Sequence, residues 1–228
     1  MDKIKIGVTG QKGFVGTHLY NTLGLSPNKF EKIDYVISFF GNDDNLDRFV
    51  EQCDVIVHLA AMNRHMDPNV IYATNIELVE KLIASLERTK TKAHVLFSSS
   101  LQEENDNPYG KSKKEGRILF QNWAKKTRGT FTGLIIPNVF GPFGKPFYNS
   151  VVATFSHQIT HGEVPEIKVD GELKLIYVGE LVSVILKKIK ERKNEPLFRV
   201  PHTSKARVSE VLSLLKKYFK TKTDSNST

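Results

Sequence analysis

Residues 3–23, KIKIGVTGQKGFVGTHLYNTL, are the stretch that decides the fold. Apolar side chains alternate with other residues over 4–8, a period that predicts a short strand. Gly10, Gly13 and Gly16 follow at intervals of three, and the residues after them have helical spacing. A strand, a glycine turn and a helix in this order form a cradle for the pyrophosphate of a dinucleotide, because glycines let backbone N–H groups approach the phosphates.

The expected dinucleotide site extends to the end of a second buried stretch. Residues 54–61, DVIVHLAA, read as a buried parallel strand, and ligands of such sheets lie beyond the carboxyl ends of the strands. The candidate cofactor-binding residues outside the later helices are Gly10, Lys12, Gly13, Phe14, Val15, Gly16, Leu59, Ala60, Ala61 and Pro137.

The stretch 32–40, KIDYVISFF, bears on the choice of cofactor, because it reads as the second strand. A fold that prefers NAD usually carries an acid at the end of this strand to hold the adenosine ribose. The expected end at 38–41 has none, and Asp43 and Asp44 are expected to begin the next helix. Lys12 is equally suited to meeting a 2′-phosphate and to lying in solvent. These features favour NADPH over NADH.

Strands and helices alternate along the chain, which predicts a Rossmann-type, doubly wound parallel α/β sheet. Further helices are expected over 70–88, 108–127, 150–161, 178–190 and 209–219, and strands over 93–97, 131–136, 173–177, 197–200 and near 167. We expect a dinucleotide-binding domain over 1–143, a small C-terminal substrate-binding lobe over 144–219 interleaved with late Rossmann elements, and a polar tail over 220–228.

Composition limits the class of protein. The single cysteine, Cys53, excludes a disulfide framework and fits a reducing compartment. Apolar runs fall short of membrane-spanning length, and the chain enters a strand at once, so neither a signal peptide nor membrane contact is expected. The sequence thus predicts a cytoplasmic protein, in which Cys53 and the strand residue His58 pack in the core.

Positive charge gathers in the second half of the chain. Residues 1–110 carry 11 Lys and Arg against 15 Asp and Glu, whereas residues 111–228 carry 22 against 10. The basic half lacks the interleaved aromatic residues of a surface for single-stranded nucleic acid. We therefore expect an anionic small substrate, such as a nucleotide diphosphate, and no nucleic acid.

Tyr109 and Lys113 are the residues most indicative of catalysis. They lie four apart at the start of an expected helix and so share one face. An ammonium close to a phenol lowers the pKa of the phenol, which then passes a proton near neutral pH. Ser100, at the end of the preceding strand, is placed to bond the same substrate oxygen. Each feature is common alone, but together with an upstream glycine turn they are specific.

These residues, with the glycine motif over 9–16, resemble those of the extended short-chain dehydrogenase/reductases that act on nucleotide sugars. The resemblance covers nearly the whole chain. The segments HLAAMNR, FSSSLQEENDNPYGKSK, PNVFG and KPFYNSVVATF narrow it to the reductase domains of capsular-polysaccharide enzymes. In those enzymes the reductase domain is followed by a cupin domain that handles epimerisation at C-3.

The resemblance implies a role for each site residue. Tyr109 protonates the alkoxide formed when hydride reaches C-4 of a keto sugar, and Ser100 positions the carbonyl oxygen. Lys113 lowers the pKa of Tyr109 and holds the nicotinamide ribose, so both residues also belong to the cofactor site. The helix Asn of the family falls on Asn75, which by itself is equally consistent with tying backbone. The implied substrate-binding residues are Asn63, Arg64, Ser100 and Asn138.

The same resemblance implies NADPH-dependent reduction of the 4-keto group of a UDP-linked 2-acetamido-2,6-dideoxyhexulose in polysaccharide synthesis, without a metal. The expected partners are the UDP-sugar, a second copy in a homodimer and a separate or removed cupin epimerase. Because the chain stops before any cupin, we expect that it does not invert C-3 alone.

Three functions other than the reductase are considered: an epimerase, a non-catalytic dinucleotide-binding protein and a dehydratase. An epimerase uses the same triad with tightly held NAD, and a non-catalytic dinucleotide-binding protein has no need of the triad. A dehydratase places an Asp–Glu pair directly after the catalytic Ser, whereas here Leu101 and Gln102 follow Ser100, and Glu103 and Glu104 come later. A dehydratase is therefore disfavoured.

Overall fold

The computed structural model describes residues 2–225, and the chain separates into two compact units. The first unit contains the residues up to Ile136 together with Val182–Val200. The second contains Pro137–Leu181 and the residues from Pro201 onward. The chain thus leaves the first unit after the strand that ends at Ile136 and returns to it at Val182, within the helix Val178–Glu191.

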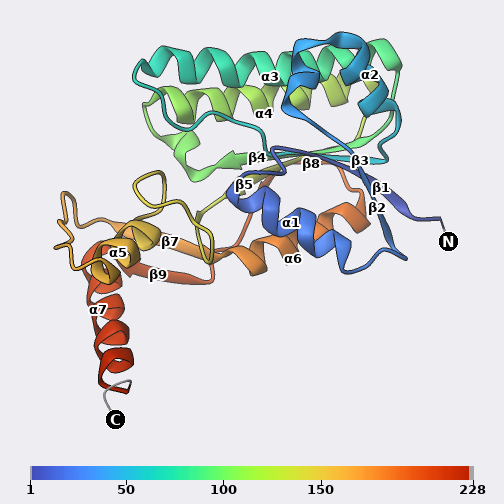
Figure 1. Cartoon of the computed structure of the whole chain (residues 1–228). Coiled ribbons are helices and arrows are strands. Elements are labelled where there is room, and N and C mark those ends of the chain that lie inside the picture. Colours follow the sequence, from blue (N-terminus) through green and yellow to red (C-terminus); the bar gives the residue numbers. More distant parts are fainter. Residues whose placement is uncertain (1, 226–228) are drawn as a thin grey trace. The chain divides into compact units, whose positions relative to one another are not determined.

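A six-stranded parallel sheet forms the centre of the first unit (Figure 1). Its order is β2-β1-β3-β4-β5-β8. The chain passes from β1 to β2 on one side and then to β3 on the other, which is the doubly wound pattern. The strands are β1 (Ile4–Thr9), β2 (Phe30–Ile33), β3 (Val55–His58), β4 (His94–Ser100), β5 (Phe131–Ile136) and β8 (Glu195–Arg199). The expected fold class is confirmed.

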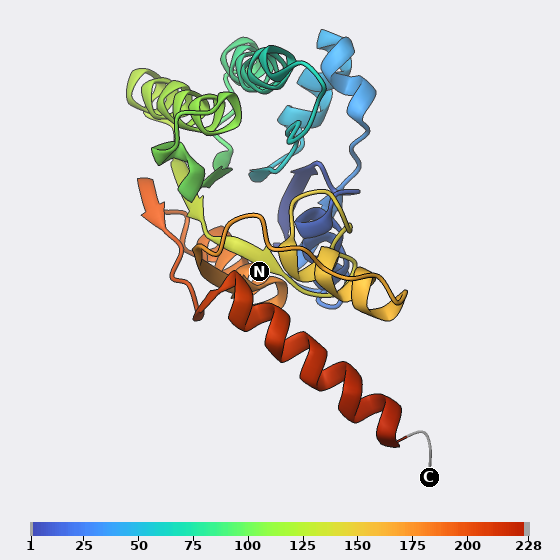
Figure 2. The same cartoon turned by 90° about the vertical axis from the view of Figure 1, so that its left-hand side faces the viewer.

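Helices cover both faces of this sheet. Helices α2 (Asp43–Glu51), α3 (Pro68–Thr89) and α4 (Pro108–Thr127) lie on one face, and α1 (Phe14–Gly24) lies on the other with the part of α6 (Val178–Glu191) that belongs to this unit (Figure 1). Figure 2 shows α3 and α4 side by side. Between them and the sheet lies a core rich in aromatic rings, among them Phe49, Phe97, Phe120 and Phe131.

The strand register shows that β4 extends further toward the carboxyl edge of the sheet than its neighbour β3. Thr9 of β1 pairs with His58, and His58 pairs with Phe97 of β4. β4 continues for three residues past Phe97 and ends at Ser100. Ser100 therefore stands at the carboxyl edge of the sheet, where ligands of doubly wound folds bind.

The expected strand over 32–40 is wrong. β2 ends at Ile33, and Ile37–Gly41 form a 3-10 helix, η1. The apolar run is buried for another reason: the Tyr35 ring packs at 5.4 Å from that of Phe49, in the cluster that also holds Phe40. A short apolar run satisfies a strand and a packed turn equally well, so periodicity alone misassigned it.

The second unit has its own small sheet, in which β6 (Asn138–Phe140) pairs parallel with β7 (Glu172–Tyr177), and β9 (Ser204–Arg207) pairs antiparallel with β7. Its other helices are α5 (Val151–Thr160) and α7 (Val208–Ser225). The expected strand near Ile167 is wrong, because that segment has no regular structure.

The expected end of the last helix at residue 219 is wrong, because α7 continues through the first residues of the polar tail to Ser225 (Figure 2). Residues 226–228 of that tail lie outside the described residues. Among the helices of residues 2–225, none is both long and apolar enough to cross a membrane.

Candidate active site

The glycine loop after β1 is shaped by two close backbone approaches. Gly10 has φ +74°, a conformation that side chains rarely adopt, and a Cβ there would lie 2.7 Å from the backbone nitrogen of Ala60. A Cβ on Gly16 would lie 2.1 Å from the carbonyl oxygen of Gly10. Only glycine at these two positions lets the loop lie directly on α1 and on the residues after β3.

The N-terminus of α1 fits an anionic group. Its N-cap is Gly13, which supplies no side-chain hydrogen bond, and its first turn holds no acidic residue. The first amides of the helix therefore keep their positive partial charge, which favours a phosphate. Phe14 and Val15 are half-buried in this turn, and Lys12 is exposed beside it. The loop is thus suited to a dinucleotide pyrophosphate.

The residues after β3 lie against the same loop. The Leu59 amide donates to the carbonyl of Thr9 at 3.1 Å, and the Ala60 amide donates to Thr9 Oγ1 at 3.3 Å. Leu59, Ala60 and the following Ala61 therefore belong to the edge of the sheet that carries the glycine turn.

Asp34 is a candidate site residue that the sequence analysis did not name. Because β2 ends at Ile33, Asp34 is the first residue after it, and its side chain is exposed. The next residue is tied to the glycine loop, since Gln11 Nε2 donates to the carbonyl oxygen of Tyr35 at 2.7 Å. An acid directly after the second strand, about 20 residues beyond the glycine motif, is the position that binds an adenosine ribose.

All three proposed catalytic residues, Ser100, Tyr109 and Lys113, lie in the first unit. Ser100 is half-buried at the end of β4, and Tyr109 is half-buried in the first turn of α4. Asn107 begins that helix by accepting a hydrogen bond from the Gly110 amide at 2.7 Å. Lys113, one turn further, is only 3 % exposed.

The surroundings of Lys113 are apolar and aromatic. Its Nζ lies 4.8 Å from the centre of the Phe97 ring and 5.8 Å from that of Tyr109. Burial lowers the pKa of Lys113 to about 7, and the negative charge of Glu103 opposes that shift. Lys113 therefore exchanges its proton near neutral pH, next to the phenol that it is expected to activate.

Asn75 has a structural role. It is buried, its Oδ1 accepts from the Met62 amide at 2.7 Å, and its Nδ2 donates to the Met62 carbonyl and to Ser112 Oγ, both at 3.0 Å. It thereby holds the segment after β3 against α3 and α4. The candidate substrate residues Asn63 and Arg64 follow Met62 directly, so Asn75 orders the start of their loop.

His58 and Cys53 are core residues, as the sequence predicted. His58 is fully buried, its Nδ1 lies 2.7 Å from Thr9 Oγ1, and burial lowers its pKa to about 3. The Cys53 thiol donates to the Phe49 carbonyl oxygen at 3.2 Å, and burial raises its pKa to about 12. Both side chains are therefore uncharged at neutral pH.

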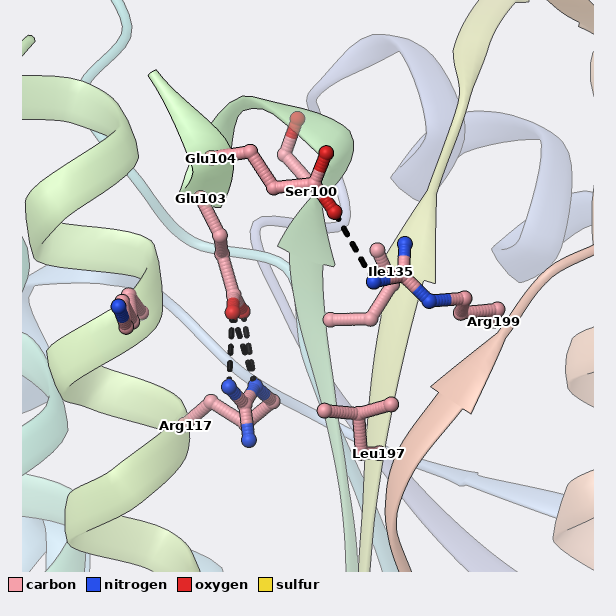
Figure 3. A pocket seen from close by; sticks show the side chains of 8 residues that line it. Ser100, Glu103, Glu104, Arg117, Ile135, Leu197 and Arg199 are labelled. Atoms are coloured by element: carbon pink, nitrogen blue, oxygen red, sulfur yellow. Dashed lines mark hydrogen bonds and ion pairs between the residues drawn. The ribbon is translucent and has the colours of Figure 1, made fainter. Parts of the chain in front are cut away.

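Two carboxylates follow Ser100 in the 3-10 helix η2 (Leu101–Glu104), beside a cavity of about 270 Å³. Figure 3 shows Glu103 directed toward Arg117 and Glu104 directed toward Arg199. Both carboxylates are paired with arginines, which further disfavours a dehydratase that needs them as free acid and base. Within residues 2–225, no group of three or more His, Cys, Asp or Glu is arranged to hold a metal ion.

Pro137 and Asn138 belong to the second unit. Pro137 is buried, whereas Asn138 is exposed on β6 and its Nδ2 donates to the Lys174 carbonyl oxygen at 3.2 Å. This bond joins β6 to β7, so Asn138 has a structural partner within its own unit.

Comparison with known proteins agrees with this arrangement. The NAD dependent epimerase/dehydratase family model matches residues 6–200. The UDP-2-acetamido-2,6-beta-L-arabino-hexul-4-ose reductase of Pseudomonas aeruginosa is 32% identical over 191 residues, which are 81% of this chain and 49% of that protein. The chain therefore spans about half the length of that relative.

Solved structures show the same fold. The capsular polysaccharide assembling protein CapF from Staphylococcus aureus superposes with a TM-score of 0.77 at 30% identity, over 94% of this chain and 57% of that one. RMD from Pseudomonas aeruginosa, solved with NADPH, superposes with a TM-score of 0.82 at 19% identity, over 93% and 81% of the two chains.

The family match spans the glycine loop, the strand that ends at Ser100 and the helix that carries Tyr109 and Lys113. The chain belongs to the NAD-dependent epimerase/dehydratase family.

Proposed function

We propose that this chain reduces the 4-keto group of a UDP-linked 2-acetamido-2,6-dideoxyhexulose in polysaccharide sugar synthesis. The observation that carries the proposal is the 32% identity to a reductase named for such a sugar, over 81% of this chain. The placement of Ser100, Tyr109 and Lys113 in one unit with the glycine loop supports an oxidoreductase. A homodimer and a separate epimerase partner also stay predictions.

The residues of the site divide the work of a carbonyl reduction. A nicotinamide dinucleotide held at the glycine loop supplies the hydride when it is bound. Tyr109 donates a proton to the oxygen that becomes the alcohol, and Ser100 donates a hydrogen bond to that same oxygen. Lys113 favours the phenolate left on Tyr109, because a cation nearby lowers the pKa of a phenol.

The end of β2 at Ile33 changes the expected cofactor, because the acid-free segment 38–41 does not follow the second strand. With β2 ending at Ile33, the exposed carboxylate of Asp34 stands where it would accept from ribose hydroxyls and repel a 2′-phosphate. We therefore propose NADH in place of NADPH. The exposed Lys12 is the residue that would weigh toward NADPH.

Incubation of the pure chain with NADH or NADPH and UDP-4-keto-6-deoxy sugars tests the reductase. We expect oxidation of the cofactor and a 4-hydroxy product, identified by mass and NMR. An epimerase instead purifies with NAD bound and interconverts 4-hydroxy sugars without net consumption of cofactor. Failure to oxidise either cofactor with the whole panel would refute the reductase.

A further inference from the structure

Glu103 and Arg117 form a buried ion pair next to the candidate active site. Arg117 Nε lies 2.9 and 3.1 Å from the two carboxylate oxygens of Glu103, and its Nη2 lies 2.8 Å from Oε2. The two side chains are only 8 % and 9 % exposed. The bidentate geometry makes the relative orientation of the two groups specific as well as their separation.

The surrounding residues accommodate this pair. The stem of Arg117 crosses Gly133 of β5, where a Cβ would lie 2.7 Å from Arg117 Cδ. The hydroxyl of Ser99 donates a further hydrogen bond to Glu103 Oε1. The carboxylate is therefore bonded from β4 and from α4, which meets the condition under which a buried charge is tolerated.

The pair connects the two elements that carry the candidate catalytic residues. Ser100 is the N-cap of η2, which holds Glu103, and Arg117 lies one helical turn after Lys113 on α4. A second contact joins the same elements, because a Cβ on Gly110 would lie 1.9 Å from the carbonyl oxygen of Gln102. We propose that Glu103 and Arg117 are positioning residues that hold Ser100 in register with Tyr109 and Lys113, an inference that rests on the proposed reductase.

The pair also acts on the charge of Lys113. The groups that face Lys113 are Tyr109 on α4, the Phe97 ring on β4, His58 on β3 and Glu103 on η2. His58 is uncharged at neutral pH, so Glu103 supplies the negative charge. Removal of that charge is expected to lower the pKa of Lys113.

Three variants and one control test the proposal. The variants are Glu103→Gln, Arg117→Met and the double variant, which removes both buried charges and so avoids an unpaired one if a single variant fails to fold. The matched control is Glu104→Gln. Glu104 belongs to the same η2 and also pairs with an arginine, Arg199 at 2.9 Å, but the two side chains are 66 % and 59 % exposed.

The first readout is the pKa of Lys113, measured by NMR of chains with 13C-labelled lysine and assigned with Lys113→Arg. It needs no substrate, so it remains valid if the reductase assay fails. We expect Glu103→Gln and the double variant to lower this pKa and Glu104→Gln to leave it unchanged, and Arg117→Met serves the second readout. Equal values in the wild type and all four variants would overturn the electrostatic part of the proposal.

The second readout is steady-state reduction. We expect Glu103→Gln and the double variant to lose about 10- to 100-fold in kcat, the size of loss that follows small misplacement of reacting groups, with unchanged affinity for the dinucleotide because the glycine loop is untouched. Wild-type kcat in the folded double variant would overturn the positioning role. A wild-type chain that reduces no keto sugar would refute the proposed function instead.

Discussion

The ammonium of Lys113 lies 5.8 Å from the centre of the Tyr109 ring, and Lys113 is almost wholly buried. In water such a pair would interact weakly, but burial removes the solvent that screens the charge. The same burial lowers the pKa of Lys113 to about 7. The site therefore places a cation beside the phenol ring while it holds that cation close to deprotonation.

Replacement of Tyr109 by Phe is expected to abolish reduction while the fold is kept. The change removes one hydroxyl and leaves the half-buried ring. General acid catalysis contributes about 10²- to 10⁴-fold, so kcat should fall by that factor. Single-turnover kinetics and thermal melting with the dinucleotide measure the two effects. Turnover close to that of the wild type would show that another group supplies the proton.

Lys113→Met is expected to stabilise the chain without ligands and to inactivate it. The unfolded chain holds the Lys113 proton up to pH about 10.5, whereas the folded chain releases it near 7. The unfolded state therefore binds more protons between these values, and the Lys113 contribution to stability rises with pH by up to about 1.4 kcal/mol per unit. Below pH 7 Lys113 is protonated in both states, so the full cost of burying its charge destabilises the folded state.

Denaturant titrations of the wild type and Lys113→Met at several values between pH 7 and 8.5 measure this difference. The window lies just above the Lys113 pKa of about 7, and Cys53, whose pKa is raised to about 12, is present in both proteins and cancels from the difference. The stability advantage of the variant should shrink as the pH rises. A difference that stays constant across the window would contradict a lowered pKa for Lys113.

The cofactor preference is expected to reside in Asp34. The wild type should give a higher kcat/KM with NADH than with NADPH. Asp34→Ser should lower the ratio of kcat/KM with NADH to kcat/KM with NADPH by about 10- to 100-fold. This is the range that a hydrogen bond to a charged group provides. Asp44→Ser, at another exposed acid in the first turn of α2, is the control. Lys12→Ala should weaken NADPH more than NADH, and an NADPH preference in the wild type would exclude our assignment of Asp34.

Gly16→Ala is expected to impair both the fold and dinucleotide binding. Its Cβ would lie 2.1 Å from the Gly10 carbonyl oxygen, so either α1 or the loop must move. We expect a loss of roughly 1–3 kcal/mol, the usual cost of overpacking, and at least tenfold weaker binding. Gly41→Ala is the matched control, because its Cβ meets nothing within 4 Å. Calorimetry measures the stability and the dinucleotide affinity of both variants. Equal losses in Gly16→Ala and Gly41→Ala would contradict the close approach at Gly16.

The parts of the site that depend on local order along the chain were predictable from the sequence. The glycine turn follows a strand and opens a helix within 21 residues, 4–24, and Tyr109 and Lys113 lie one turn apart on one helix. The spacing of these residues already determines their geometry. Their backbone conformations follow from local rules that need no knowledge of distant elements.

The misplaced β2 end shows the limit of such rules. Residues 32–40 are apolar enough for a strand, yet Tyr35 and Phe40 are buried by packing with α2 and the core instead. Only the sheet register shows that pairing with β1 stops at Ile33. The ribose-binding candidate is therefore Asp34, which the sequence analysis did not name, since the role of an acid depends on where the strand ends.

The sequence by itself determined the Rossmann-type order of strands and helices and the glycine turn, and it predicts Ser100, Tyr109 and Lys113 as the catalytic set. The tertiary structure alone decided the partners of Glu103 and Arg117, which are 14 residues apart and meet beside Gly133 of another strand. It also decided the charge state of Lys113. The physical reason is that desolvation and ion pairing depend on which elements exclude water around a group, and the spacing of residues along the chain does not specify that.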